Sequence, residues 1–195
     1  MMNGIKNLKL HVDKQLLICL LSSLSFGLAA HASMLFNKFS WFDDLGNMTS
    51  IGMTWRLGRW MLGIIEAFFI KVLGTTLYST PVFNGMITLV FIGMASWLLC
   101  RMLKIERISE MVILTGILIV NPAVTSLFGY MFTAPAYGFG ILAMVMASYL
   151  ICMGDKWKQA AGIVLAACSI GIYQADSSIL ITVLCLFLMR ECFTS

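Results

Sequence analysis

Long apolar runs separated by short polar breaks occupy almost the whole chain. The first run covers residues 15–37 without a charged side chain. Five shorter runs follow, at residues 82–100, 111–128, 137–153, 157–173 and 177–189. A helix of about 20 apolar residues crosses a bilayer. The pattern therefore predicts an all-α integral membrane protein, a polytopic helical bundle of about six spans.

The runs divide one transmembrane domain, residues 1–195, into four parts. Residues 1–14 form a lead that carries three lysines, and residues 15–37 form the first span. Residues 38–81 form an extracytoplasmic loop, and residues 82–195 hold five further short spans. A cleavable signal peptide is the alternative reading of the first run, because basic, apolar and small residues follow one another there.

The placement of Lys and Arg decides how the loop lies. If the apolar stretch 60–78 does not cross, nine of the 13 Lys and Arg residues face the cytoplasm, but if it crosses only three do. Cytoplasmic loops carry the excess of Lys and Arg. Residues 50–78 are therefore expected as one or two amphipathic juxtamembrane helices on the outer surface, interrupted near Gly58 or Gly63.

Local signals shape the later spans. Asn121-Pro122 is expected to kink its span, and the small residues at spacing four, Ala143/Ala147 and Gly162/Ala166, suit close helix packing or are ordinary lipid-facing residues. Tyr173, Gln174 and Asp176 are expected as a polar cluster in an outer hairpin turn. A single tilted helix with Asp176 buried is the alternative, which the cost of a charge in the bilayer disfavours.

Composition removes several function classes. The chain is 60% hydrophobic and 11% charged, with a mean hydropathy of +0.92, which excludes a soluble core, disorder and a secreted disulfide scaffold. None of the six cysteines stands at ligand spacing, and the sequence contains no nucleotide-binding, zinc-protease, serine-hydrolase or dithiol motif. Basic residues confined to loop ends exclude a nucleic-acid partner. No cofactor is expected, with a divalent metal left open.

Two pairs of charged residues in the outer loop are candidates for chemistry. Asp43 and Asp44 can accept a proton, cap a helix, bind a cation or simply form a solvated loop. Arg56 and Arg59 share a helix face and suit a lipid phosphate, or else snorkel to anionic headgroups. Glu66, with Lys71 five residues later, is interpreted as part of a solvated face.

These residues resemble a known family. The motifs Trp41-Phe42-Asp43-Asp44, Gly58-Arg59-Trp60, Asn121-Pro122 and Tyr173-Gln174 stand in the order seen in the bacterial and phage glucosyl transferases that modify lipopolysaccharide O-antigen and change serotype. The likeness to these GtrII-like enzymes covers about residues 15–192. It implies a GT-C-type membrane glycosyltransferase whose site lies in the first extracytoplasmic loop.

The resemblance also implies substrates and roles. The partners are undecaprenyl-phosphate glucose, the O-antigen polysaccharide and the lipid bilayer, and the multi-pass enzyme resides in the bacterial inner membrane with its site facing the periplasm. Asp43 or Asp44 is the expected general base, and Arg56 and Arg59 hold the donor phosphate. Three further residues, Trp60, Tyr173 and Gln174, are expected to line the cavity.

Members of this family are about twice as long as this chain, so we expect a fragment or truncated product that corresponds to the N-terminal half. A small transporter or flippase-like subunit is the rival function, indicated by Asp176 and the broken helix at Asn121-Pro122. An inactive remnant is the third hypothesis.

Overall fold

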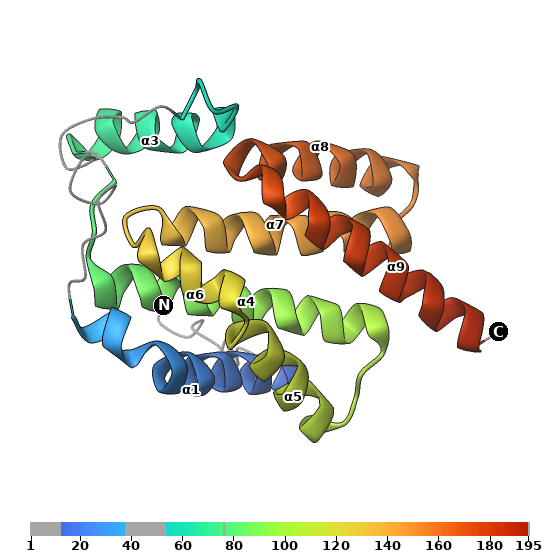
Figure 1. Cartoon of the computed structure of the whole chain (residues 1–195). Helices are drawn as coiled ribbons and strands as arrows, with labels where there is room; N and C mark the ends of the chain where they lie inside the picture. Colours follow the sequence, from blue (N-terminus) through green and yellow to red (C-terminus); the bar gives the residue numbers. More distant parts are fainter. Residues whose placement is uncertain (1–12, 38–53, 76, 195) are drawn as a thin grey trace, which may run out of the picture.

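The computed structural model describes residues 13–37, 54–75 and 77–194, and within these ranges the chain forms helices and no strands. Asp43 and Asp44, the predicted catalytic residues, lie outside the described residues. The helices are α1 (Lys14–Phe36), α3 (Trp60–Leu73), α4 (Pro81–Leu103), α5 (Ile108–Ile119), α6 (Pro122–Gly129), α7 (Ala134–Met153), α8 (Lys156–Ile172) and α9 (Ser177–Thr194), with a 3-10 turn, η1 (Gln174–Asp176), between the last two (Figure 1).

α1 and α4 pack side by side in opposite directions (Figure 1). Near the start of α1, Cys19 lies within hydrogen-bonding reach of Cys100, close to the end of α4. Near the end of α1, Leu35 packs against Gly85 in the first turns of α4. The chain therefore leaves α1 and enters α4 at the same end of the bundle, which we call the α3 end. This arrangement agrees with the expectation that residues 60–78 do not cross the membrane, which stays a prediction.

Charge separates the two ends of the bundle. Of the ten Lys and Arg residues in the described part of the chain, three lie at the α3 end: Arg56, Arg59 and Lys71. Seven lie at the opposite end, where α4, α7 and α9 finish: Lys14, Arg101, Lys104, Arg107, Lys156, Lys158 and Arg190. The asymmetry matches the count made from the sequence and favours a cytoplasmic location for the opposite end.

In the part of the chain that the structure describes, three helices are long and apolar enough to cross a membrane: α1, α4 and α7. The bent pair α5–α6 raises this number to four if the pair counts as one span. α8 and α9 also run between the two ends of the bundle (Figure 1), but within the described residues neither meets the same criteria. The expected number of six spans is therefore not confirmed.

The expected kink at Asn121-Pro122 is present. α5 and α6 meet at an angle of 49°. Pro122 lacks the N–H that would continue the hydrogen bonding of α5 and instead occupies the first turn of α6. The Asn121 side chain accepts a hydrogen bond from the Ala123 N–H at 2.8 Å, which caps the new helix.

The small residues of α7 and α8 lie at a close interface between these helices. Ala143, Ala147 and Ala166 are buried. A β-carbon added to Gly162 would come within 2.9 Å of the Ala147 carbonyl oxygen. The two backbones approach so closely because these side chains are small, as expected for small residues at spacing four.

α3 differs in detail from the expected surface helix. It begins at Trp60, after a turn in which Gly58 has φ +73°, so the expected interruption near Gly58 is confirmed. Its exposed stripe is apolar and consists of Trp60, Ile64, Phe68 and Val72. Glu66 is buried, and the prediction of a solvated face is wrong at this residue, because the helix turns its acid inward and its apolar side outward.

Candidate functional site

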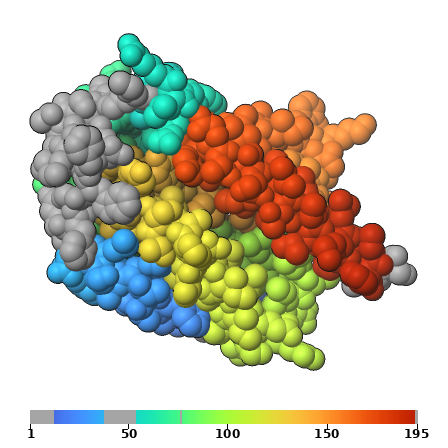
Figure 2. Space-filling view, in the orientation of Figure 1, coloured from blue at the N-terminus to red at the C-terminus, as the bar shows by residue number. Residues whose placement is uncertain are grey.

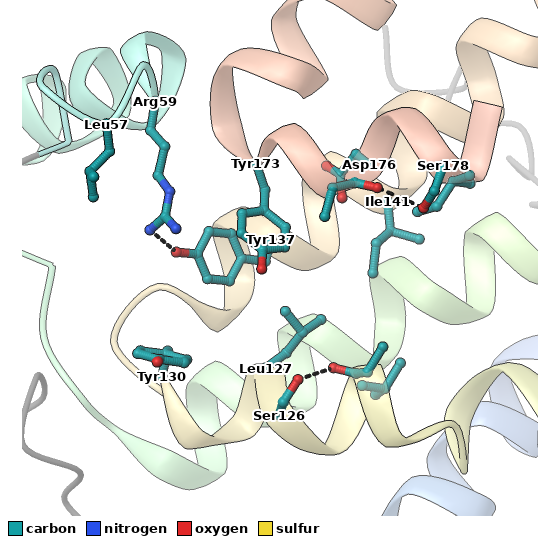
Figure 3. A pocket seen from close by; sticks show the side chains of 14 residues that line it. Leu57, Arg59, Ser126, Leu127, Tyr130, Tyr137, Ile141, Tyr173, Asp176 and Ser178 are labelled. Carbon is teal, nitrogen blue, oxygen red and sulfur yellow. Dashed lines mark hydrogen bonds between the residues drawn. The ribbon is translucent and has the colours of Figure 1, made fainter. Parts of the chain in front are cut away.

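A cavity of about 410 Å³ lies at the α3 end of the bundle. It is enclosed by the turn before α3, by α6, by the first turns of α7 and by the connection from α8 to α9. Its polar lining comes from Arg59, Ser126, Tyr130, Tyr137, Tyr173, Asp176 and Ser178 (Figure 3). We call it the polar cavity, and its volume is typical of small-molecule sites.

Arg59 reaches the polar cavity from the residue that precedes α3. The preceding turn is closed by the Arg59 N–H, which donates to the Thr54 carbonyl at 2.9 Å. The positive φ of Gly58 favours glycine at this bend. The backbone therefore aims the half-buried guanidinium back toward the bundle, where Figure 3 shows it extending to Tyr137.

The guanidinium of Arg59 has no acidic partner among the described residues. Its Nη1 donates to the Tyr137 hydroxyl at 3.1 Å, and its central carbon lies 5.1 Å from the centre of the Tyr173 ring. Its Nε is buried and makes no hydrogen bond within the described part of the chain. A partly buried cation without a carboxylate suits an anion, and arginine binds phosphate oxygens in pairs.

Two tyrosine rings form one wall of the polar cavity. The centres of Tyr137, in the first turn of α7, and Tyr173, directly after α8, lie 5.1 Å apart. The expectation that Tyr173 faces a cavity agrees with its position in this wall. The sequence pattern did not lead us to predict Tyr137 as a site residue. A signal was available, because Tyr137 is a hydroxylated aromatic residue soon after Pro135, at the outer end of a predicted span.

Asp176 is the acid of the polar cavity. The expected hairpin is confirmed, because α8 ends at Ile172 and α9 begins at Ser177. The expected exposure of Asp176 at the outer surface is wrong: its side chain is only 4% exposed. The Ser169 hydroxyl lies 3.0 Å from Oδ2, and burial raises the pKa of this carboxyl to about 7.

Trp60 and Gln174, both expected in the cavity wall, are not among its lining residues. The Gln174 amide donates to the Leu57 carbonyl and so ties η1 to the turn before Arg59. The Trp60 ring covers Gly171, where an added β-carbon would collide with it. Both side chains therefore fix the start of α3 against the end of α8.

The structure separates the two arginines. Arg56 is exposed in the turn and does not line the polar cavity, whereas Arg59 does. The expected carboxylates, Asp43 and Asp44, belong to residues outside the described ranges. Within the described chain no three His, Cys, Asp or Glu side chains are grouped to hold a metal ion.

The polar cavity continues into an apolar groove. The groove, about 330 Å³, lies between α5–α6 on one side and α9 on the other, with α4 and α7 beneath. It shares five lining residues with the polar cavity: Ala123, Val124, Ile141, Ser178 and Ile179. Beyond them its walls are mostly Leu, Ile and Val. Figure 2 shows the face on which α9 (red) and α6 (yellow) are neighbours.

A second apolar cavity, of about 660 Å³, lies between α3 and the first halves of α4 and α7. It has no lining residue in common with the polar cavity. Of these two apolar spaces, the groove beside α9 is therefore the one that adjoins the polar cavity.

Comparison with known proteins gives one match. Residues 32–195 match the family described as glucosyl transferase GtrII. No curated protein matches the chain. No solved structure matches it.

Proposed function

The chain belongs to the glucosyl transferase GtrII family, and from this premise we propose that it transfers glucose from undecaprenyl-phosphate glucose to lipopolysaccharide O-antigen. The reaction takes place on the periplasmic side of the inner membrane. One observation carries the proposal: Arg59 faces the polar cavity without an acidic partner among the described residues.

The cavity and the groove together suit the donor. Arg59 offers a cation to the phosphate, and the tyrosine wall offers an apolar surface to the sugar ring. The groove between α5–α6 and α9 offers a long apolar surface to the hydrocarbon chain. Undecaprenyl-phosphate glucose is an amphiphile with the three matching parts: an anionic phosphate, a sugar ring and a long hydrocarbon tail.

Charge supports the periplasmic side. The polar cavity lies at the α3 end, which holds three of the ten described Lys and Arg residues, and the basic opposite end is the cytoplasmic one under the positive-inside rule. A site on that side has no cytosolic nucleotide sugar to use. A lipid carrier that brings glucose across the membrane supplies the sugar instead.

In the proposed reaction, an acceptor hydroxyl attacks the anomeric carbon of glucose. The new C–O bond forms as the bond to the phosphate oxygen breaks, and the released electron pair stays on the phosphate, which Arg59 neutralises. Asp43 or Asp44 takes the hydroxyl proton as general base. Arg56 adds a second cation near the headgroup, and Trp60 and Gln174 hold the turn that presents Arg59.

The experiment is glucose transfer in proteoliposomes that contain the chain, radiolabelled undecaprenyl-phosphate glucose and O-antigen acceptor. Arg59→Gln is expected to lower kcat/KM by about 10²-fold, the usual cost of removing a charge-stabilising group. Arg56→Gln is expected to cost a few-fold. Lys71→Gln, an exposed cation on α3, is the matched control and retains wild-type activity.

Two results contradict the proposal. Wild-type transfer by Arg59→Gln removes Arg59 from phosphate binding. Absence of transfer by the folded wild type, with donor and acceptor both supplied, removes the enzymatic function itself and favours the inactive remnant. Asp43→Asn and Asp44→Asn, made singly, then identify the base, and unchanged activity in both removes that assignment.

A further inference from the structure

Asp176 and Arg59 occupy different parts of the polar cavity. Figure 3 shows them on opposite sides of the tyrosine wall. They form no ion pair, since no salt bridge of the described chain includes either residue. The cavity therefore has two polar centres, one cationic and one carboxylic.

The contacts of Asp176 suit a protonated carboxyl. Ser169 Oγ lies 2.8 Å from the Gly140 carbonyl oxygen and 3.0 Å from Asp176 Oδ2. The hydroxyl has one proton, so it cannot donate fully to both oxygens. If Oδ2 carries a proton, Asp176 donates to Ser169 and Ser169 donates to Gly140. Both contacts of the Ser169 oxygen are then full hydrogen bonds.

Within the described chain, no cationic side chain pairs with Asp176, and the Ser169 hydroxyl opposes the effect of burial on the pKa of the carboxyl only in part. Three elements pack against η1: α7, α8 and α9. The titratable groups that face the carboxyl from them are Tyr137 on α7 and Tyr173 at the end of α8, and residues 177–184 of α9 include none. Arg59 is the charged group across the cavity and forms no pair with Asp176. An unpaired buried carboxylate is costly, so the neutral acid is the stable form.

Gly140 makes room for this arrangement. A β-carbon at this position would lie 2.5 Å from Asp176 Oδ2. The absence of a side chain on α7 therefore lets the carboxyl sit against the helix backbone, where Ser169 also bonds.

We propose that Asp176, held as a neutral acid by Ser169, forms the sugar-binding end of the polar cavity, where its Oδ1 accepts a hydrogen bond from a hydroxyl of the hexose. Within the described chain, no hydrogen bond uses Oδ1, and the residue lines the cavity. The subsite takes a polyhydroxylated ring next to a phosphate. This inference rests on the proposed function, because Arg59 must hold the phosphate that the sugar bears.

Asparagine at position 176 reproduces the neutral acid. Its amide N–H donates to Ser169 as the acid proton does, and its carbonyl oxygen accepts from the sugar. Asp176→Asn is therefore expected to keep a kcat/KM roughly tenfold above that of Asp176→Ala at pH 6, because only asparagine keeps the hydrogen-bond acceptor. Ionisation of Asp176 puts a negative charge in the cavity that binds the donor phosphate. Wild-type transfer is therefore expected to fall as the pH rises through about 7, where burial places the pKa of Asp176, and the fall is absent in Asp176→Asn.

Asp176→Ala tests the binding of the sugar separately from the binding of the phosphate. Binding of two lipids to the full chain in detergent is measured, undecaprenyl-phosphate glucose and undecaprenyl phosphate. The variant is expected to bind undecaprenyl-phosphate glucose roughly tenfold more weakly, because it loses one hydrogen bond to a buried group. Undecaprenyl phosphate, which lacks the hexose, binds as it does to wild type.

The outcomes separate this inference from the proposed function. If the wild type binds neither lipid and transfers nothing, the proposed function fails. If the wild type transfers glucose but Asp176→Asn is inactive at every pH, Asp176 works ionised and the neutral-acid subsite is overturned. Equal weakening of both lipids by Asp176→Ala also overturns it, since that result indicates a structural role.

Discussion

Arg59 donates a hydrogen bond to the Tyr137 hydroxyl at 3.1 Å across 78 positions of sequence. The bond joins the turn before α3 to the first turn of α7. It fixes the direction of a guanidinium whose backbone lies in a turn, and so determines where an anion meets the cation.

Removing the hydroxyl tests this relationship. Tyr137→Phe is expected to raise the KM for the donor lipid roughly tenfold with a smaller change in kcat, because the hydrogen bond positions a charged group. Steady-state transfer kinetics in proteoliposomes measure both constants. Tyr149→Phe, on the same helix and away from the polar cavity, is the control. A variant with unchanged KM shows that Arg59 finds its direction without Tyr137.

Buried acids predict how stability depends on pH. Burial raises the pKa of Asp176 from 3.8 to about 7 and that of Glu66 from 4.5 to about 6. The folded state thus binds more protons than the unfolded state between these limits, and its stability falls as pH rises from about 4 to about 7. Stability is highest below that interval and levels off above it.

Asp176→Asn is expected to reduce the loss of stability over the whole range up to pH 7. Glu66→Gln is expected to reduce the loss of stability only below pH 6. Reversible unfolding in detergent over pH 4–8 measures both effects. Glu110→Gln, an exposed acid at the opposite end, is the control and keeps the wild-type slope. Curves for Asp176→Asn parallel to wild type contradict the burial of that carboxyl.

The contact between α7 and α8 predicts an asymmetric response to added volume. Gly162→Val places atoms against the Ala147 carbonyl and is expected to destabilise the fold by about 1–3 kcal/mol. Ala161→Val, next to it but exposed, is expected to cost less than about 0.5 kcal/mol. Thermal unfolding of the two variants in detergent compares them, and equal midpoints contradict the close approach of the helices.

The antiparallel α1–α4 pair predicts the topology. In a variant without native cysteines, Lys71→Cys is expected to react with an impermeant maleimide added to the periplasmic side of the membrane. Lys158→Cys is expected to react only from the cytoplasmic side. Both positions are exposed. Labelling of the two cysteines from one side contradicts the placement of α3 and the start of α8 at opposite ends.

The sequence predicts what local chemistry determines. Apolar runs and the Lys and Arg asymmetry are properties of neighbouring residues, so the helical runs and the non-crossing loop followed from them. Pro122 breaks a helix wherever it stands in one, and the kink was predictable for that reason. The number of spans was harder to predict, since α8 and α9 do not meet the length and hydropathy criteria that the longer helices meet.

The polar cavity depends on long-range contacts, which local patterns do not reveal. Insertion cost argued against a buried Asp176, but the fold supplies Ser169 as a partner and Gly140 as space. Likewise, Arg56 and Arg59 are the same residue type in the same segment, so the sequence alone does not distinguish them. In the structure they differ because of the turn at Gly58 and the hydrogen bond from Arg59 to the Tyr137 hydroxyl.

The antiparallel pairing of α1 and α4 has a consequence for variation within the family. Because the chain leaves α1 and enters α4 at one face of the membrane, insertions or deletions between Asn37 and Thr54 reverse no later helix. A doubling of loop length costs only about 0.6 kcal/mol of closure entropy. Changes in the length of this segment therefore leave the directions of the later helices unchanged.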